Sequence, residues 1–185
     1  NDVFIIGAGP SAVKHSDEIE SYIKKYKPFV IALNTKKSIN SNLINARAAC
    51  HPVRVLADCE EYINLPQPLI VPSSMLPKNV KQKLKQEKLY DFDITIDANS
   101  FQFNATSCTI PNLLVLSYAL AIATSGKARQ ILLAGFDGYV ADDPRRKEID
   151  KVFDLYQRAT SSVDFFSITE TLYEIPIKSI YGLNQ

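Results

Sequence analysis

The sequence contains only three cysteines among its 185 residues. Cys50, Cys59 and Cys108 lie far apart and have no paired spacing, so the sequence predicts neither a disulfide framework nor a zinc site. We therefore expect a reducing, cytoplasmic setting and no metal ion in this chain.

Neither sign of charge is in excess, because 21 Lys and Arg residues face 20 Asp and Glu residues, a formal net charge of +1. Such a chain has no field that would attract a nucleic-acid backbone or an anionic membrane. No apolar run reaches the roughly 18 to 20 residues that span a bilayer. With 46% hydrophobic residues, six Gly and ten Pro, the composition also excludes a disordered or collagen-like chain. The sequence thus predicts a globular protein without a nucleic-acid partner or a membrane span.

The sequence shows no signal-peptide pattern, because strand-like sequence begins at Val3. It also has no initiator methionine. A chain of this length buries roughly 70% of its unfolded surface, which is enough for one developed core. We expect one domain over residues 1–185, excised from a longer polypeptide.

Short apolar runs alternate with longer amphipathic stretches, which predicts an α/β fold: a Rossmann-like, open, mostly parallel sheet with helices on both faces. The expected strands are residues 3–6, 29–33, 44–50, 69–71, 92–96, 130–134 and 163–168. The expected helices are residues 16–27, 52–62, 78–88, 111–126 and 146–159, with a hairpin or excursion at 101–103. In such sheets the ligand binds beyond the carboxyl ends of the strands, at the switch point in strand order.

The strongest local motif is Gly7-Ala8-Gly9-Pro10-Ser11-Ala12, directly after the first expected strand. Its first glycine allows a tight turn, its second lets a phosphate approach the backbone, and the N–H groups that follow can bind negative charge. The motif fits the dinucleotide fingerprint. Two features weigh against a dinucleotide, namely a helix expected only from Ser16 and Asn34 where an acid would bind the ribose. The alternative is a glycine turn that serves backbone geometry alone.

Two segments resemble a known group of proteins. Residues 4–11 look like the Gly-x-Gly-Pro-Ser turn of bacterial CMP-sialic-acid-dependent sialyltransferases, and are similar to the turn of the Rossmann-like motility accessory factors. Residues 116–139, which include Gly135-Phe136-Asp137-Gly138, look like the Ala-rich helix, Gly, strand and Gly-x-Asp segment of those families. The resemblance implies that the turn wraps a nucleotide phosphate, with a CMP-type nucleotide sugar as donor in surface-polysaccharide biosynthesis.

A narrower resemblance involves residues 48–58, Ala-Ala-Cys-His-Pro-Val-Arg-Val-Leu-Ala-Asp. This stretch is similar to the C-terminal extension of HMG-CoA-lyase-like proteins of the 4-hydroxy-2-oxovalerate aldolase type. The resemblance implies a partner, an N-terminal aldolase-like barrel of the same polypeptide. A (β/α)₈ barrel takes roughly 250 residues, so the lyase chemistry would belong to that other part.

Two candidate catalytic residues lie at expected strand ends. His51 follows the strand expected at 44–50, where a neutral imidazole can take a proton from an acceptor hydroxyl; the alternative is a histidine that caps the helix at Pro52. Asp137 follows the strand expected at 130–134, where a carboxylate can bind sugar hydroxyls or a divalent ion. The alternative for Asp137 is an Asx-turn within its own backbone.

Three further residues are candidates for binding. Ser107 precedes the helix expected from Pro111, so its hydroxyl and the nearby N–H groups can form a second anion site or simply cap the helix. Asn34 can bind a base or sugar edge, and Arg54 can neutralise a phosphate.

These residues support three functions. The first is a nucleotide-sugar-binding, glycosyltransferase-like domain, with the nucleotide over Gly7, Gly9, Pro10 and Ser11. The second is a non-catalytic nucleotide- or partner-binding module of the aldolase-like barrel. The third is a dinucleotide-binding oxidoreductase domain.

Overall fold

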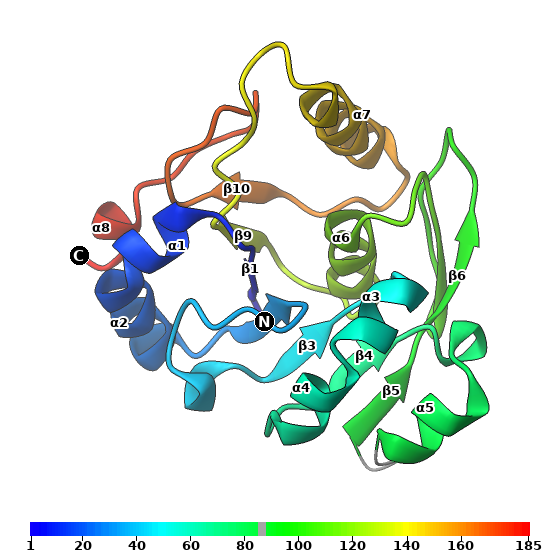
Figure 1. Ribbon diagram of the computed structural model, residues 1–185. Coiled ribbons are helices and arrows are strands. Elements are labelled where there is room, and N and C mark those ends of the chain that lie inside the picture. The colour runs from blue at the N-terminus through cyan, green and yellow to red at the C-terminus, as the bar shows by residue number, and fades with distance from the viewer. Residues whose placement is uncertain (85–87) are drawn as a thin grey trace.

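Seven parallel strands form the central sheet of the computed structural model, which describes residues 1–84 and 88–185 (Figure 1). The strands are β1 (Val3–Ile6), β2 (Phe29–Leu33), β3 (Ala46–Ala48), β4 (Leu69–Val71), β5 (Leu89–Asp91), β9 (Ile131–Ala134) and β10 (Phe165–Ser167). Their spatial order is β10-β9-β1-β2-β3-β4-β5, and every neighbouring pair is parallel. The predicted α/β fold with an open parallel sheet is confirmed.

A second, three-stranded sheet is inserted between β5 and the helix that follows. It contains β6 (Asp93–Ile96), β7 (Gln102–Phe103) and β8 (Ser107–Ile110), with β8 in the middle, parallel to β6 and antiparallel to β7. The strand expected at 92–96 therefore forms, but it belongs to this sheet and not to the central one. Phe101 and Ile110 share one hydrophobic cluster with Ile5 of the central sheet, so the two sheets share a core.

Eight helices accompany the two sheets in the described chain. They are α1 (Pro10–Lys14), α2 (Ser16–Tyr26), α3 (Pro52–Ala57), α4 (Cys59–Asn64), α5 (Lys78–Lys83), α6 (Val115–Ser125), α7 (Pro144–Arg158) and α8 (Ile180–Leu183). Two short 3₁₀ turns, Ser41–Leu43 and Ser73–Met75, complete the elements. Within the described ranges, no helix is both long and apolar enough to cross a membrane.

Side chains alternate along each strand, so buried apolar side chains point to both faces of the central sheet, and helices cover both faces. Ile5 and Leu133 point to the face that packs on α6, α7 and the small sheet. Phe4 and Val30 point to the opposite face, which α1, α2 and α8 cover. Helices α3, α4 and α5 continue this layer beside β3 and β4, because Leu69 of β4 belongs to their hydrophobic cluster. Leu69 lies on the same face as Ala32, which belongs to the cluster of α1, α2 and α8, because both residues pair in register with Arg47.

The first helix differs from the prediction. A helix does begin at Ser16, but α1 precedes it and starts at Pro10, directly after the glycine turn. Proline suits the first helical position, because its φ is already helical and no N–H is lost from the helix. The two helices are separate because His15 adopts non-helical angles, φ −110° and ψ 25°. The argument against a dinucleotide that rests on a late helix start is therefore wrong.

The segment around Ser107 also differs from the prediction. Residues 107–110 form β8 and no helix N-terminus, because Cys108 and Ile110 are buried while Ser107 and Thr109 are less so, a period of two. Helix α6 begins at Val115, four residues after Pro111.

Two expected helices are shorter than predicted. The helix expected over 52–62 is divided into α3 and α4 at Asp58. The helix expected over 78–88 ends at Lys83, and Lys88 comes just before β5. Lys85, within that expected helix, lies outside the described residues.

A buried tyrosine joins α6 to the small sheet. The Tyr118 hydroxyl donates a hydrogen bond to the Phe92 carbonyl at 2.6 Å, and Tyr118 is fully buried. We expect Tyr118→Phe to lower the free energy of unfolding by about 1–3 kcal/mol, because the carbonyl loses its donor without access to water. Exposed Tyr90→Phe should change it by less than about 0.5 kcal/mol. Urea unfolding measures both, and equal midpoints would contradict this role for Tyr118.

Candidate functional site

The turns that follow β1 and β9 pack against each other, backbone to backbone. β1 lies between β2 and β9, which is the switch point in strand order. The Gly9 N–H donates to the Gly135 carbonyl at 2.8 Å. A Cβ on Gly7 would lie 2.6 Å from the Gly135 carbonyl oxygen, and a Cβ on Gly9 would lie 2.6 Å from the same atom. Glycine at 7 and 9 is therefore required for this close approach.

Asp137 ties the two turns together. Its carboxylate accepts a hydrogen bond from the Ser11 N–H at 2.9 Å and another from the Ser11 hydroxyl. Ser11 Oγ also lies 2.8 Å from Thr169 Oγ1, which accepts the Gly135 N–H at 3.1 Å. The Asx-turn alternative is wrong, because the partner of Asp137 lies 126 positions earlier in the chain.

The carboxylate of Asp137 thus lies at the start of α1, where the sequence predicts a phosphate. The N–H groups of Gly7, Gly9 and Ser11 donate to Ala134, Gly135 and Asp137 respectively. Among the residues that the structure describes, none accepts the N–H of exposed Ala8. The sequence predicts several free backbone N–H groups in this turn, but in the described structure only the Ala8 N–H has no acceptor.

A cavity of about 460 Å³ opens beside these turns, at the carboxyl ends of β1, β2 and β9. It lies where the sheet topology predicts a ligand site. Six of the predicted site residues line it: Gly7, Gly9, Pro10, Asn34, Arg54 and Asp137.

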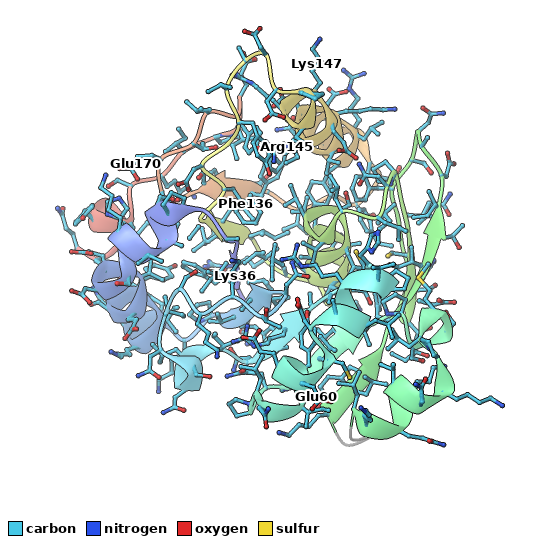
Figure 2. All side chains as sticks on the ribbon, viewed as in Figure 1. Lys36, Glu60, Phe136, Arg145, Lys147 and Glu170 are labelled. Atoms are coloured by element: carbon cyan, nitrogen blue, oxygen red, sulfur yellow. The ribbon has the colours of Figure 1, made fainter. Side chains whose placement is uncertain are left out.

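One wall of this cavity is apolar and aromatic. It is formed by Leu114, Leu116, Phe136, Tyr139, Ile149 and Tyr173. The Arg145 guanidinium lies 4.1 Å from the centre of the Tyr139 ring, and Figure 2 shows Phe136 and Arg145 in the region between α1 and α7. Burial raises the pKa of Tyr173 further above physiological pH. The wall gives the cavity a surface suited to a flat, weakly polar group.

The segment after β10 places Tyr173 in the wall. The Leu172 N–H donates to the Asp137 carbonyl at 2.8 Å, and the Thr171 hydroxyl donates to the Phe136 carbonyl at 2.7 Å. No periodic pattern in the sequence marks this segment. Tyr139, by contrast, lies two residues after Asp137, so its place beside the site could be predicted from the Gly-x-Asp turn.

A buried arginine fixes the loop that carries Asn34. Arg47 of β3 is 1% exposed, and its Nη1 donates to the carbonyls of Asn34 at 3.0 Å and Lys36 at 2.8 Å. Its Nε donates to Gln67 Oε1 at 3.0 Å, and burial lowers the pKa of the guanidinium. Asn34 itself is held in the left-handed region, with φ 53°. The loop after β2 is therefore positioned from inside the protein.

Arg54 provides the cation that lines the cavity. It lies on α3, is exposed, and forms one long ion pair with Asp58, at 3.7 Å between Arg54 Nε and Asp58 Oδ2. An exposed pair at this distance contributes little to stability. Arg54 is therefore available to an anionic ligand.

Three predicted site residues do not line the cavity. Ser11 is buried behind the turn, in its bonds to Asp137 and Thr169. Ser107 lies in the small sheet. His51 is exposed and immediately precedes α3, and β3 ends at Ala48, two residues before the end that the sequence predicts. The His51 side chain forms no capping bond to α3 and does not line the cavity.

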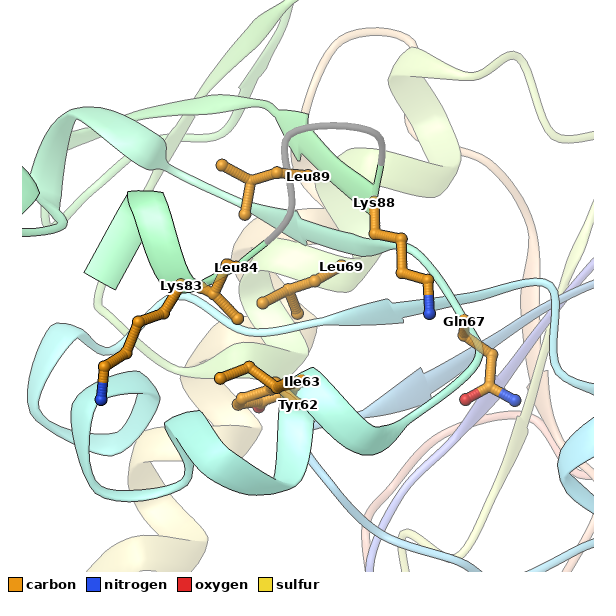
Figure 3. Close-up of a pocket in the computed structure, with 8 residues that line it drawn as sticks. All are labelled: Tyr62, Ile63, Gln67, Leu69, Lys83, Leu84, Lys88 and Leu89. Carbon is orange, nitrogen blue, oxygen red and sulfur yellow. The ribbon is translucent and has the colours of Figure 1, made fainter. Parts of the chain in front are cut away.

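A second, much smaller cavity lies between α4, α5 and β4 (Figure 3). Its volume of about 20 Å³ holds a single water molecule. Leu69, Leu84 and Leu89 line it, and Lys83 extends away from this group in Figure 3. It is too small for a nucleotide.

No three His, Cys, Asp or Glu side chains within residues 1–84 and 88–185 are grouped so that they could hold a metal ion. All three cysteines are free and buried. Burial raises the pKa of the Cys50 and Cys108 thiols to about 12, which keeps them protonated and unreactive at neutral pH.

Comparison of the chain with protein-family models, with curated proteins and with solved structures finds no match. The site is therefore interpreted from its own geometry and from the motifs of the sequence.

The close contact between the two turns predicts that a methyl group added at Gly9 destabilises the protein. We expect Gly9→Ala to lower the free energy of unfolding by about 1–3 kcal/mol, because the new Cβ would lie 2.5 Å from Asp137 Oδ1 and 2.6 Å from the Gly135 oxygen. Gly182→Ala is the control, since its Cβ would have no neighbour nearer than 3.9 Å. Thermal unfolding measures both variants. A Gly9→Ala variant as stable as the control would show that the turns do not pack in this way.

The buried thiols give a second prediction. In native buffer at pH 7 we expect Ellman's reagent to modify Cys50, Cys59 and Cys108 at a small fraction of the rate seen in denaturant, where all three react. Absorbance at the thionitrobenzoate band follows the reaction. Rapid labelling of any cysteine in the native chain would contradict its burial.

Proposed function

We propose that the chain is a nucleotide-binding, glycosyltransferase-like domain that takes a CMP-linked sugar in the cavity at the switch point. One observation carries the proposal: a cavity of about 460 Å³ combines an aromatic wall, an exposed arginine and polar groups at the end of three parallel strands. This volume lies within the range of small-molecule sites, and its position is the one that open α/β sheets use. The resemblance of residues 4–11 and 116–139 supports the choice of nucleotide.

The lining suggests how such a ligand lies. The base stacks on the aromatic wall, where Arg145 covers one face of Tyr139 and orients the ring. The phosphate binds Arg54 and the N–H of Ala8, because the Ser11 N–H is occupied by Asp137. The Asn34 side chain binds hydroxyls of the ribose.

Within this proposal Asp137 is the general base. An acceptor hydroxyl attacks the anomeric carbon, the bond from that carbon to the phosphate oxygen breaks, the nucleotide leaves, and the hydroxyl proton passes to Asp137. The Ser11 hydroxyl and N–H orient the carboxylate for this step. His51 has no part in it, because it does not line the cavity.

A dinucleotide fits less well. The start of α1 at Pro10 matches the dinucleotide fingerprint, but the N–H that would bind a pyrophosphate there already bonds Asp137. Asn34 also lacks the negative charge that binds a ribose diol in NAD sites.

Thermal-shift measurements with CMP, CDP, UDP, NAD and FAD test the proposal. At a CMP concentration about 100 times its Kd, we expect roughly 2.7 kcal/mol of stabilisation, or a Tm rise of roughly 5–10 °C. Arg54→Gln should weaken CMP binding roughly 10- to 100-fold, because a charge-assisted hydrogen bond is lost.

Arg158→Gln is the matched control. Arg158, like Arg54, is an exposed arginine paired with an aspartate four residues away on a helix, but it lies outside the cavity. Its substitution should leave CMP binding unchanged. A shift with NAD or FAD alone would support the dinucleotide function. No shift with any nucleotide would overturn the proposal and leave the partner-binding module of an aldolase-like barrel.

A further inference from the structure

A third cavity, separate from the proposed nucleotide site, lies beside α1 and α8. Its volume is also about 460 Å³. Its lining includes His15, Glu170, Lys178 and Tyr181. Three of these side chains, His15, Glu170 and Tyr181, form a hydrogen-bonded row that the proposed function does not use.

His15 is the centre of this row. Its Nε2 lies 2.8 Å from Glu170 Oε2, and its Nδ1 lies 3.0 Å from the Tyr181 hydroxyl oxygen. The imidazole is 9% exposed, and its ring meets the Tyr181 ring edge-on, at 5.7 Å between centroids. Both ring nitrogens are therefore engaged, one by a carboxylate and one by a phenol.

The direction of the hydrogen bonds follows from the charge of Glu170. Hydrogen bonds from Lys14, from the backbone and from His15 lower the pKa of this carboxyl to about 2. An ionised carboxylate only accepts, so Nε2 of His15 carries a proton. In the neutral imidazole Nδ1 is then an acceptor, and the Tyr181 hydroxyl donates to it.

We propose that Tyr181, His15 and Glu170 form a proton relay that makes the Tyr181 phenol a nucleophile toward acyl groups of activated esters. His15 takes the phenol proton as the oxygen attacks, and Glu170 stabilises the imidazolium that results, which is the logic of a nucleophile, base and orienting acid. The relay faces a cavity large enough for a small ester.

The step balances with p-nitrophenyl acetate as the acyl donor. Tyr181 Oη forms a bond to the acetyl carbonyl carbon, and the ester bond to p-nitrophenolate breaks. The phenol proton passes to His15 Nδ1 and from there to solvent. The products are O-acetyl-Tyr181 and p-nitrophenolate.

The chain provides matched control tyrosines. Tyr181 is 50% exposed, while Tyr90 and Tyr26 are 55% and 46% exposed. Neither control tyrosine hydroxyl bonds an imidazole in the described structure. Differences in acetylation rate between Tyr181 and these two therefore report the relay and not exposure.

The experiment measures O-acetylation of each tyrosine by peptide mass spectrometry after brief exposure of the 185-residue chain to p-nitrophenyl acetate. We expect Tyr181 to react at least about tenfold faster than Tyr90 and Tyr26 at neutral pH. His15→Phe keeps an aromatic ring but removes the proton acceptor, and should bring Tyr181 to the control rate. Equal rates for the three tyrosines, or a fast Tyr181 in His15→Phe, would overturn the proposal.

A positioning role for Glu170 is tested by Glu170→Gln, with exposed Glu174→Gln as its control. Glu170→Gln should slow Tyr181 several-fold and shift the rising limb of its pH–rate profile to lower pH, because the imidazolium loses the carboxylate that stabilises it, while Glu174→Gln should change neither. The other charged groups around the relay are Lys14, bonded to Glu170, and Lys178, which lines the cavity. If His15→Phe does not fold, the unsubstituted chain decides the question: a Tyr181 rate that rises with pH in parallel with those of Tyr90 and Tyr26 would overturn the relay.

Discussion

The close approach of two turns, after β1 and after β9, is the constraint on which the rest of the site depends. Glycines at 7 and 9 allow the contact, and the Asp137 carboxylate holds it through Ser11. A negative charge at the start of a helix is itself favourable, and Asp137 occupies the Ser11 amide that a phosphate would otherwise bind. The groups left for a ligand are therefore the aromatic wall, Arg54 and the amide of Ala8 within the turn.

The segment after β10 links the two large cavities. Thr169 bonds Ser11 and Gly135 in the network of the switch point, while its neighbour Glu170 bonds His15 and Lys14 on the other side. A few residues later, Tyr173 lies in the aromatic wall. This segment has little regular secondary structure, so its position depends on these side-chain bonds and on backbone bonds such as that from Leu172 to Asp137.

The central strands could be predicted because they are continuous apolar runs buried on both faces, as in β1, β2 and β9. β5 is largely exposed and β8 alternates over only four residues, so neither has that signal. Asp137 and Ser11 were both identifiable as candidate residues, but their pairing was not, because the contact spans 126 positions. His51 was misplaced by an error of two residues in the end of β3, which is the usual scale of error for such boundaries.

The charges of the cavity limit the ligand that it can take. Arg54 is the lining cation, and it already has Asp58 as a partner, while the carboxylate of Asp137 also lines the cavity. A nucleoside diphosphate would place two phosphate groups against one shared cation and would be repelled by Asp137. A phosphodiester such as a CMP-sugar carries a single phosphate charge. Its affinity would come mainly from the aromatic wall, where burial of about 100 Å² of apolar surface contributes roughly 2.5 kcal/mol. The geometry thus favours a monophosphate-linked ligand over a diphosphate-linked one.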